Sequence, residues 1–343
     1  GAVNCGLIGY PLGHSYSPQI HRALADYDYR LWPLKPEELE AFLVKRDFAG
    51  INVTIPYKER VIPYLDQLSD TARAIGAVNT VVNRDGKLYG DNTDLAGMLA
   101  LIRRTGLALE GKKVLILGTG GTSKTARAAA SQLGAAEVYR VSRSGRDGAV
   151  TYRQAEEEHG DAACIINTTP CGMYPDLGGC PVELDGFPCL EGVVDVIYNP
   201  LRSELVLGAR QRGIPAEGGL YMLAAQAAYA SALFRGCEAT AGDIELAYRT
   251  VLHRMENIVL IGMPSSGKTT VGRLLAQRTG KEFVDTDALV EQAVDMTVPD
   301  YFAAKGESAF REREKEAVAS AAASGGKVIA TGGGAILRPE NLR

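Results

Sequence analysis

Short apolar runs alternate with amphipathic stretches along the whole chain. Runs such as 5–9, 50–55 and 114–117 have the length and apolar character of buried strands, and stretches with helical spacing, such as 19–27 and 36–46, separate them. This alternation is typical of α/β proteins, in which helical crossovers join parallel strands. The pattern therefore predicts an α/β fold with parallel sheets.

The predicted strands fall into three series. They are 5–9, 30–34, 50–55 and 78–83, then 114–117, 137–142, 163–167 and 193–197, and last 258–261, 282–284 and 327–330. Two predicted helices, 220–234 and 241–255, lie between the second and third series. A strand-like run restarts at Asn257 directly after the second of these helices, so we place a domain boundary near Glu256.

Length and composition narrow the class of protein. The 343 residues correspond to two domains or slightly more, at about 150 residues per domain. Hydrophobic residues make up 46% and charged residues 23%, which is ordinary for globular proteins and excludes disorder and collagen-like structure. The net charge is −4 and no run of Lys or Arg stands out, so no nucleic-acid partner is expected. The one dense charge run, 311–316, alternates in sign and predicts a solvated helix face.

The cysteine pattern and the apolar segments exclude several further classes. The six cysteines form no C-x-x-C pair, and neither a structural zinc site nor a disulfide framework is expected. No run of 18 apolar residues and no secretory leader is present, so we expect a cytoplasmic protein with no membrane partner, and a homodimer is one possible assembly. Because the chain starts at Gly1, close to a strand-like run, we expect a fragment or a processed chain.

The strongest motif is Gly-Met-Pro-Ser-Ser-Gly-Lys-Thr at 262–269, which matches the phosphate-binding pattern G-x-x-x-x-G-K-[ST]. It follows a strand-like run and precedes a helical pattern, as that pattern requires. In such loops backbone N–H groups hold phosphates, Lys268 would reach the β/γ oxygens, and the Thr269 hydroxyl would ligate Mg²⁺. An ordinary glycine-rich turn is the alternative.

A second glycine-rich turn, Gly-Thr-Gly-Gly-Thr-Ser at 118–123, also joins a predicted strand to a predicted helix. It is not the full dinucleotide pattern and is weak alone. Dinucleotide sites usually place an acid about 20 residues later, on the ribose hydroxyl. Here Arg143 stands near that position, with Arg146 beyond, and this favours a 2′-phosphate and hence NADP over NAD. The alternative is that both arginines are ordinary exposed loop residues.

Several polar residues could be functional or merely structural when each is taken alone. Lys58 follows an apolar strand that ends at a proline, and it could be a surface charge. Asp94 precedes a helical stretch and could be an N-cap. Gln226 lies in an otherwise apolar helix, where it could bond a polyhydroxylated ligand or its own backbone. Ser15 and Ser17 alternate in a loop after the first strand and could cap the next helix.

Taken together, residues 1–255 closely resemble shikimate dehydrogenase. Seven segments carry the resemblance in the family's order: 13–18, 52–58, 76–80, 90–94, 118–122, 167–173 and 219–226. The resemblance implies NADPH-dependent reduction of 3-dehydroshikimate to shikimate. It also implies a substrate-binding domain formed by 1–95 with 219–255, a Rossmann-type NADP domain at 96–218, and an active site in the cleft between them. Alternatives are a quinate/shikimate dehydrogenase that uses NAD and a non-catalytic ligand-sensing module.

The same resemblance assigns roles to residues. Lys58 and Asp94 would form the acid/base pair, since hydride transfer to a ketone leaves an alkoxide that needs a proton. The substrate would be bound by Ser15, Ser17, Thr54, Lys58, Asn79, Asp94, Tyr198 and Gln226. The cofactor would be bound by Gly118, Gly120, Gly121, Thr122, Ser142, Arg143, Ser144 and Gly219. Ser142-Arg143-Ser144 keeps the arginine of the family's Asn-Arg-Thr pattern and changes both neighbours.

Residues 257–343 resemble the N-terminal part of shikimate kinase, through the 262–269 loop and segments 284–287, 306–311 and 331–335. This implies ATP and Mg²⁺ as ligands and shikimate, the product of the first activity, as substrate. Nucleotide binding would involve Gly262, Ser265, Ser266, Gly267, Lys268, Thr269 and Thr270, and the metal would bind Thr269 and Asp285. Shikimate would contact Asp287, Arg311, Gly332, Gly333 and Gly334.

The resemblance stops at Arg343, before the family's lid, its later arginines and its adenine-binding segment. We therefore expect an incomplete P-loop module without kinase turnover, in which strand 258–261 lies at an unpaired edge.

Overall fold

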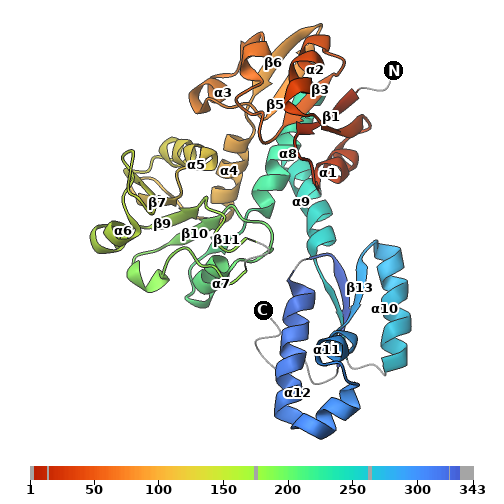
Figure 1. The fold of residues 1–343 in the computed structure, drawn as a ribbon. Helices are drawn as coiled ribbons and strands as arrows, with labels where there is room; N and C mark the ends of the chain where they lie inside the picture. Colours follow the sequence, from red (N-terminus) through yellow and green to blue (C-terminus); the bar gives the residue numbers. More distant parts are fainter. Residues whose placement is uncertain (1–3, 14, 174–176, 262–264, 324, 333–343) are drawn as a thin grey trace. The chain divides into compact units, whose positions relative to one another are not determined.

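The computed structural model describes residues 4–13, 15–173, 177–261, 265–323 and 325–332. The chain folds into two compact units, and the division along the chain falls between Val251 and Leu252 (Figure 1). Within the described residues, no helix is both long and apolar enough to cross a membrane.

The first sheet of the first unit is mixed. Its strand order is β2 (Asp28–Pro33), β1 (Asn4–Gly9), β3 (Gly50–Val53), β5 (Thr80–Arg84), β6 (Lys87–Asp91) and β4 (Gln67–Leu68). β1 pairs in parallel with β2 and β3, whereas β5 is antiparallel to both β3 and β6. The expectation of parallel strands is therefore wrong for this part of the sheet. For β5 and β6 the physical reason is the Asp85-Gly86 turn, where both residues have positive φ (54° and 85°) and form a tight hairpin.

Helices cover both faces of this sheet. On one face, α2 (Leu39–Lys45) and α3 (Asp70–Ile75) enclose a core that includes Ile8, Ile51 and Val81. On the other face lie α1 (Ser17–Leu24) and α8 (Leu220–Arg235). Gly50 permits close packing there, because a Cβ at this position would lie 2.3 Å from the ring of Phe234. Two short 3₁₀ turns, Pro36–Glu38 and Ile62–Tyr64, border the sheet.

The second sheet is parallel throughout, with the order β11 (Ala216–Glu217), β10 (Gly192–Asp195), β9 (Cys164–Asn167), β7 (Lys113–Leu117) and β8 (Glu137–Val141). Leu115 and Leu117 pack with α6 (Tyr152–Glu158) and α7 (Glu204–Gln211) on one face. Val114 and Ile116 pack with α4 (Asp94–Arg104) and α5 (Gly121–Gln132) on the other. A 3₁₀ turn lies at Leu184–Gly186. The strand order reverses between β7 and β9, the usual ligand-binding point of such sheets.

Helices α4 and α8 pack side by side between the two sheets of the first unit (Figure 1). Gly97 of α4 is part of this contact, since a Cβ there would lie 2.9 Å from the carbonyl oxygen of Met222. α9 (Ala241–Met255) follows α8 and leads along the chain toward the second unit. Because α4 begins at the end of the first sheet and α8 begins at the end of the second, residues of both sheets meet near these helix starts.

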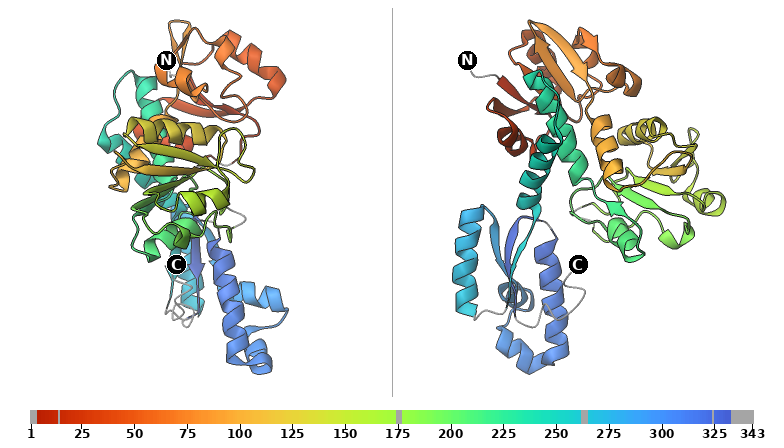
Figure 2. Two further views of the ribbon diagram at one scale, coloured as in Figure 1. Left: turned by 90° about the vertical axis from the view of Figure 1, so that its left-hand side faces the viewer. Right: turned by 180° about the vertical axis from the view of Figure 1, so that it is seen from behind.

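The second unit contains a parallel sheet with the order β12 (Ile258–Leu260), β14 (Lys327–Ala330) and β13 (Glu282–Asp285). Its strands lie between α10 (Ser265–Thr279) and α12 (Val298–Ala322), with α11 (Thr286–Val294) connecting β13 to α12 (Figures 1 and 2). Gly306, with a φ of 86°, breaks α12. Among the described residues β12 is an edge strand, as predicted for 258–261, and Val259 is 51% exposed.

Candidate active site

A cavity of about 440 Å³ opens in the first unit beside the starts of α4 and α8. All eight residues that the sequence assigned to substrate binding line it: Ser15, Ser17, Thr54, Lys58, Asn79, Asp94, Tyr198 and Gln226. Thr122 and Gly219, from the predicted cofactor set, line it as well. Most of the lining comes from the first sheet and its loops, while Thr122 and Tyr198 follow strands of the second sheet. The structure thus brings residues from seven separate segments to one cavity.

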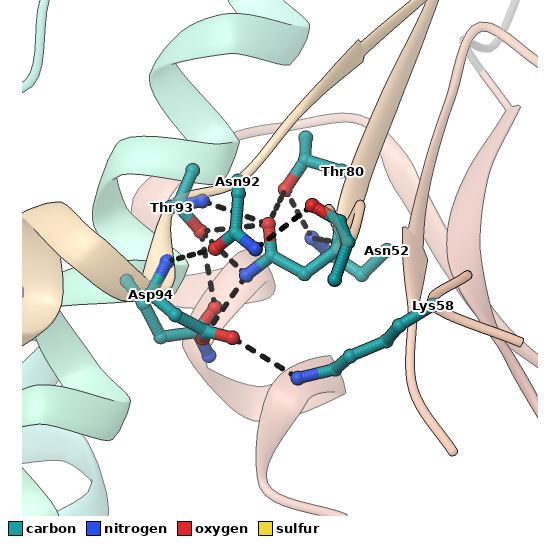
Figure 3. Close-up of polar contacts among 9 residues, drawn as sticks. Asn52, Lys58, Thr80, Asn92, Thr93 and Asp94 are labelled. Atoms are coloured by element: carbon teal, nitrogen blue, oxygen red, sulfur yellow. Dashed lines mark hydrogen bonds and ion pairs between the residues drawn. The ribbon is translucent and has the colours of Figure 1, made fainter. Parts of the chain in front are cut away.

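Lys58 and Asp94 form an ion pair at this cavity, with 3.0 Å between Nζ and Oδ2 (Figure 3). The lysine side chain is 35% exposed and the aspartate 21%, so both charges keep access to the cavity. Asp94 opens α4 but makes no N-cap hydrogen bond; the helix is preceded by Thr93, and the Asp94 carboxylate faces Lys58 instead. The N-cap and surface-charge interpretations of these two residues therefore do not hold.

Asn79 fixes the orientation of the Asp94 carboxylate. The Asn79 amide nitrogen donates to Asp94 Oδ1 at 3.1 Å and to Thr93 Oγ1 at 3.0 Å. Its side-chain oxygen, Asn79 Oδ1, accepts the backbone N–H of Thr93 at 2.8 Å, and this bond determines which way the side-chain amide faces. The Asp94 N–H donates to Asn92 Oδ1 at 2.9 Å, as Figure 3 shows. Asp94 is thus held through its backbone and through both carboxylate oxygens.

Hydroxyl, amide and aromatic groups complete the cavity. Thr93 Oγ1 lies 3.3 Å from Gln226 Oε1, so α8 is joined to the start of α4. The backbone N–H of Ser17 donates to Ser15 Oγ at 3.2 Å, which holds the loop that carries both hydroxyls. The rings of Tyr16 and Tyr198 meet edge to face, with 6.5 Å between their centroids. One basic group, one carboxylate and several neutral donors and acceptors suit a small anionic polyol.

Sequence reasoning did not select several residues that line this cavity. They are Asn52, Tyr16, His21, Met222 and Leu223, with Thr93 buried beside them. All of them except His21 stand inside segments used for the resemblance (13–18, 52–58, 90–94 and 219–226), so motif membership was the available signal. His21 lies outside these segments and has no local pattern that distinguishes it from a core residue.

The predicted phosphate turn lies where β7 leads into α5. Gly118 has a φ of 107°, and a Cβ there would lie 2.6 Å from Thr168 Oγ1, so the turn requires glycine. A Cβ at Gly120 or Gly121 would meet no atom within 4 Å, which leaves the backbone at the start of α5 open. The first turn of α5 carries no acidic residue. The open N-terminus and its N–H groups suit an anionic phosphate.

The segment after β8 holds the predicted adenosine-side residues. Ser142 Oγ accepts the N–H of Gly145 at 3.0 Å, and Ser144 Oγ accepts the N–H of Arg146 at 3.3 Å. These bonds order a turn from which the Arg143 side chain extends, exposed and with no ion pair in the described part of the chain. Gly219, also predicted to bind the cofactor, lines the cavity; a Cβ there would lie 1.9 Å from the Val196 carbonyl oxygen, so glycine allows the start of α8 to approach the end of β10.

The second unit places its predicted nucleotide lysine at the carboxyl end of its sheet. Lys268 is buried in α10 and donates a hydrogen bond to the carbonyl oxygen of Thr331, directly after β14. Ser265, Ser266, Gly267, Thr269 and Thr270 lie in the first turns of α10. Gly262, Gly333 and Gly334 lie outside the described residues.

The acidic residues of this unit lie at the end of β13. Asp285 caps α11, and its Oδ1 accepts the N–H of Asp287 at 3.0 Å. Burial raises the pKa of Asp287, the charge of Asp285 raises it further, and the charge of Lys268 opposes both effects. The carboxylates of Asp285 and Asp287 therefore lie close enough to the Lys268 ammonium for their charges to interact. The Thr269 hydroxyl and the Asp285 carboxylate are oxygen donors of the kind that Mg²⁺ prefers.

The charge run 311–316 is not a uniformly solvated face, and that prediction is wrong for Glu314. Glu314 is only 2% exposed, and both of its oxygens accept hydrogen bonds from Arg311 Nη1, at 3.0 and 3.2 Å. A Cβ at Gly332 would lie 3.3 Å from Glu314 Oε2 and 3.7 Å from Asp287 Oδ1. Burial of a carboxylate requires such a partner, so Arg311 and Glu314 form a partly internal pair, while Glu312, Arg313 and Glu316 of the same run are exposed.

Comparison with known proteins places this geometry in a family. Residues 7–81 match the family model of the shikimate dehydrogenase substrate binding domain, and residues 264–343 match that of shikimate kinase. A shikimate dehydrogenase (NADP(+)) of Clostridium perfringens is 37% identical over 254 residues, which cover 67% of this chain and 92% of the relative. The chain belongs to the shikimate dehydrogenase family. Its assignment as an enzyme of this family, with a shikimate kinase match at its C-terminal side, is confirmed.

Solved structures of the dehydrogenase family share the fold. One is shikimate 5-dehydrogenase from Thermus thermophilus in complex with NADP(H) and shikimate, which is 32% identical with a TM-score of 0.64 and covers 72% of this chain and 99% of its own. Another is quinate dehydrogenase from Corynebacterium glutamicum in complex with NAD, 28% identical with a TM-score of 0.65, covering 73% and 99%. Both substrate types thus occur among close structural neighbours.

Proposed function

We propose that the first unit reduces 3-dehydroshikimate to shikimate with NADPH. The observation that carries the proposal is the Lys58–Asp94 pair, which opens onto a cavity lined by hydroxyl and amide groups. The similarity to NADP-dependent shikimate dehydrogenases and to a complex with NADP(H) and shikimate supports it.

Within this proposal the substrate is held by neutral donors at one end and by the ion pair at the other. Ser15, Ser17 and Tyr198 would bind the carboxylate end, and Thr54, Asn79 and Gln226 would bind the hydroxyl groups. Their hydroxyls and amides present several donors to a ligand that has a carboxylate and several oxygens. This arrangement would place the carbonyl carbon of the substrate beside Lys58 and Asp94.

The acid/base pair would supply the proton that the reduction needs. NADPH, when bound, supplies the hydride. Lys58, as an ammonium, would donate a proton to the carbonyl oxygen, and the charge of Asp94 would stabilise the ammonium beforehand. A cation already in position also stabilises the negative charge that develops on this oxygen. In the reverse direction, Lys58 would accept the hydroxyl proton.

We propose a division of labour within the first unit. Residues 1–95 with 219–255 would form the substrate-binding part, and residues 96–218 the NADP-binding part. The backbone around Gly118, Gly120, Gly121 and Thr122 would hold the pyrophosphate, because a side chain at Gly120 or Gly121 would fill open space there. Arg143, extended from the turn made by Ser142 and Ser144, would read the 2′-phosphate.

Residues 257–343, which lie in the second unit, are proposed to bind ATP with Mg²⁺, and shikimate. Lys268 and the first turn of α10 would hold phosphates, and Thr269 with Asp285 would hold Mg²⁺. Asp287 and Arg311, brought close to Gly332, would contact shikimate. The product of the first unit would then be the substrate of the second. Absence of kinase turnover stays a prediction, as does a homodimer.

One assay separates the proposed reaction from its rivals. The chain is supplied with shikimate or quinate and with NADP or NAD, and reduced cofactor is followed by absorbance. Turnover is expected with shikimate and NADP and should fall strongly in the Lys58→Ala variant. Faster turnover of quinate with NAD would instead establish a quinate dehydrogenase. Shikimate binding without turnover of any pair would establish a sensing module.

A further inference from the structure

Tyr29 lies behind the cavity wall and bonds a residue that lines it. The side chain, on β2, is 3% exposed, and its hydroxyl donates to Asn52 Oδ1 at 2.8 Å. The Ser17 hydroxyl is a second partner of the same phenol oxygen. Burial keeps the pKa of Tyr29 well above its ordinary value, so the hydroxyl remains a donor. Tyr29 therefore touches two residues of the candidate site without facing the substrate itself.

From Tyr29 a directional chain of hydrogen bonds leads to the acid/base pair. Because Asn52 Oδ1 accepts from Tyr29, the Asn52 amide nitrogen donates to the backbone carbonyl oxygen of Asn79 at 3.3 Å and to Thr80 Oγ1 at 3.2 Å. Thr80 Oγ1 in turn donates to Asn79 Oδ1 at 3.0 Å. Figure 3 shows Asn52 and Thr80 as links of this chain, and Asp94 with Lys58 at its far end.

Each hydrogen bond in this chain fixes the orientation of the next side chain. Asn79 Oδ1 accepts from Thr80 and from the Thr93 backbone, so the Asn79 amide nitrogen must face Asp94. Asn52, Asn79 and Thr80 are all buried, and water cannot easily replace a missing partner. A buried network of this kind is rigid only when every member is satisfied.

A neutral histidine holds the Tyr29 ring. His21 stacks on it, with 4.0 Å between centroids and 10° between planes. Burial, and to a lesser degree the charge of Arg235, lower the pKa of His21 to about 3, so the imidazole carries no charge at neutral pH. The hydroxyl of Tyr27 bonds the same imidazole and Ser231, but it has no bond to Asn52. Tyr27 and Tyr29 thus share a cluster and differ in their contact with the chain.

We propose that Tyr29 and Thr80 are positioning residues for the Lys58–Asp94 pair, acting through Asn52 and Asn79. The inference rests on the proposed dehydrogenase function. It goes beyond that function because neither residue faces the reacting atoms. It predicts that removal of a single hydroxyl behind the cavity slows the chemical step without weakening the binding of the cofactor.

The experiment compares Tyr29→Phe, Thr80→Val and, as matched control, Tyr27→Phe in shikimate oxidation with NADP. Tyr29→Phe and Thr80→Val should each lower kcat by about tenfold, because lost bonds in a buried chain disturb the reacting geometry. Tyr29→Phe removes the donor to Asn52 Oδ1, and Thr80→Val removes an acceptor of the Asn52 amide nitrogen and a donor to Asn79 Oδ1. The dissociation constant for NADP should stay within twofold. Tyr27→Phe should keep kcat within twofold, even if its unfolding midpoint falls as far as that of Tyr29→Phe.

The double variant Tyr29→Phe with Thr80→Val should lose no more than the poorer single variant, because both interrupt one chain. Equal kcat for Tyr27→Phe and Tyr29→Phe, or losses that multiply, would overturn the inference while the proposed function stood. A parent chain that does not oxidise shikimate would overturn the proposed function and this inference with it. If Tyr29→Phe does not fold, Thr80→Val alone decides, since it interrupts the same chain.

Discussion

The Asp94 carboxylate is shared between two partners on different segments: Oδ2 meets the Lys58 ammonium at 3.0 Å, and Oδ1 meets the Asn79 amide at 3.1 Å. Each oxygen therefore has its own fixed donor. The lysine can change its protonation state while Asn79 still holds the carboxylate. This separation suits a group that must gain and lose a proton in every catalytic cycle.

Replacing Lys58 with Ala should lower kcat far more than it raises KM, because proton donation is completed only in the transition state. General acid–base groups contribute about 10²–10⁴-fold. The measurement is NADPH oxidation with 3-dehydroshikimate, with Lys45→Ala, an exposed lysine of α2, as control. A kcat within a few-fold of the parent would remove Lys58 from the proposed mechanism.

Replacing Arg143 with Ala should weaken NADPH binding by about ten- to a hundredfold and NADH binding much less, because only NADPH offers a 2′-phosphate to the guanidinium. KM values for both cofactors at saturating substrate give the comparison. Arg153→Ala, an exposed arginine of α6, is the control. Equal losses for the two cofactors in Arg143→Ala would show that this side chain does not read the phosphate.

His21 should make the first unit less stable in acid. Its pKa is about 3 in the folded chain against an ordinary value of 6.5, so the unfolded chain binds the proton first. The stability it contributes is complete above pH 6.5 and is lost progressively as pH falls toward 3. Between pH 7 and pH 5 the parent should lose about 2 kcal/mol more than His21→Phe.

Trp32 makes this measurement specific. It is the only tryptophan of the chain and lies on β2, so its fluorescence during urea unfolding reports the first unit. The two proteins are unfolded at both pH values and the free energies compared. An equal loss of unfolding free energy in parent and variant between the two pH values would mean that His21 is not the group that titrates.

Replacing Lys268 with Ala should abolish binding of Mg²⁺–ATP to the second unit, because its ammonium is the buried cation at the carboxyl end of that sheet. Titration calorimetry measures the affinity, and Lys305→Ala, an exposed lysine of α12, serves as control. Adding shikimate to the parent and analysing for shikimate 3-phosphate tests turnover in the same sample. Unchanged ATP affinity in Lys268→Ala would contradict the proposed phosphate site.

The strands of the second and third sheets were predicted from sequence except the two-residue β11, because apolar runs in parallel strands are easily recognised. β6 was not predicted: residues 87–91 mix Lys, Gly and Asp with two apolar positions, and only the Asp85-Gly86 turn signals a hairpin. The resemblance selected Lys58 and Asp94, but the structure was needed to find Thr80. Thr80 faces Asn52 through the antiparallel register of β3 and β5, and register is not encoded in local spacing.

Helix α8 makes the order of synthesis matter. It packs against the first sheet, with Phe234 over Gly50, and brings Gln226 to the cavity, yet it follows the entire second sheet along the chain. A ribosome that has made only the first sheet has therefore produced an open face, with Cys5, Leu7 and Tyr29 lacking the helix that covers them. The two sheets of this unit therefore cannot complete their folding one after the other. One face of the first sheet stays uncovered until about residue 235 has been synthesised.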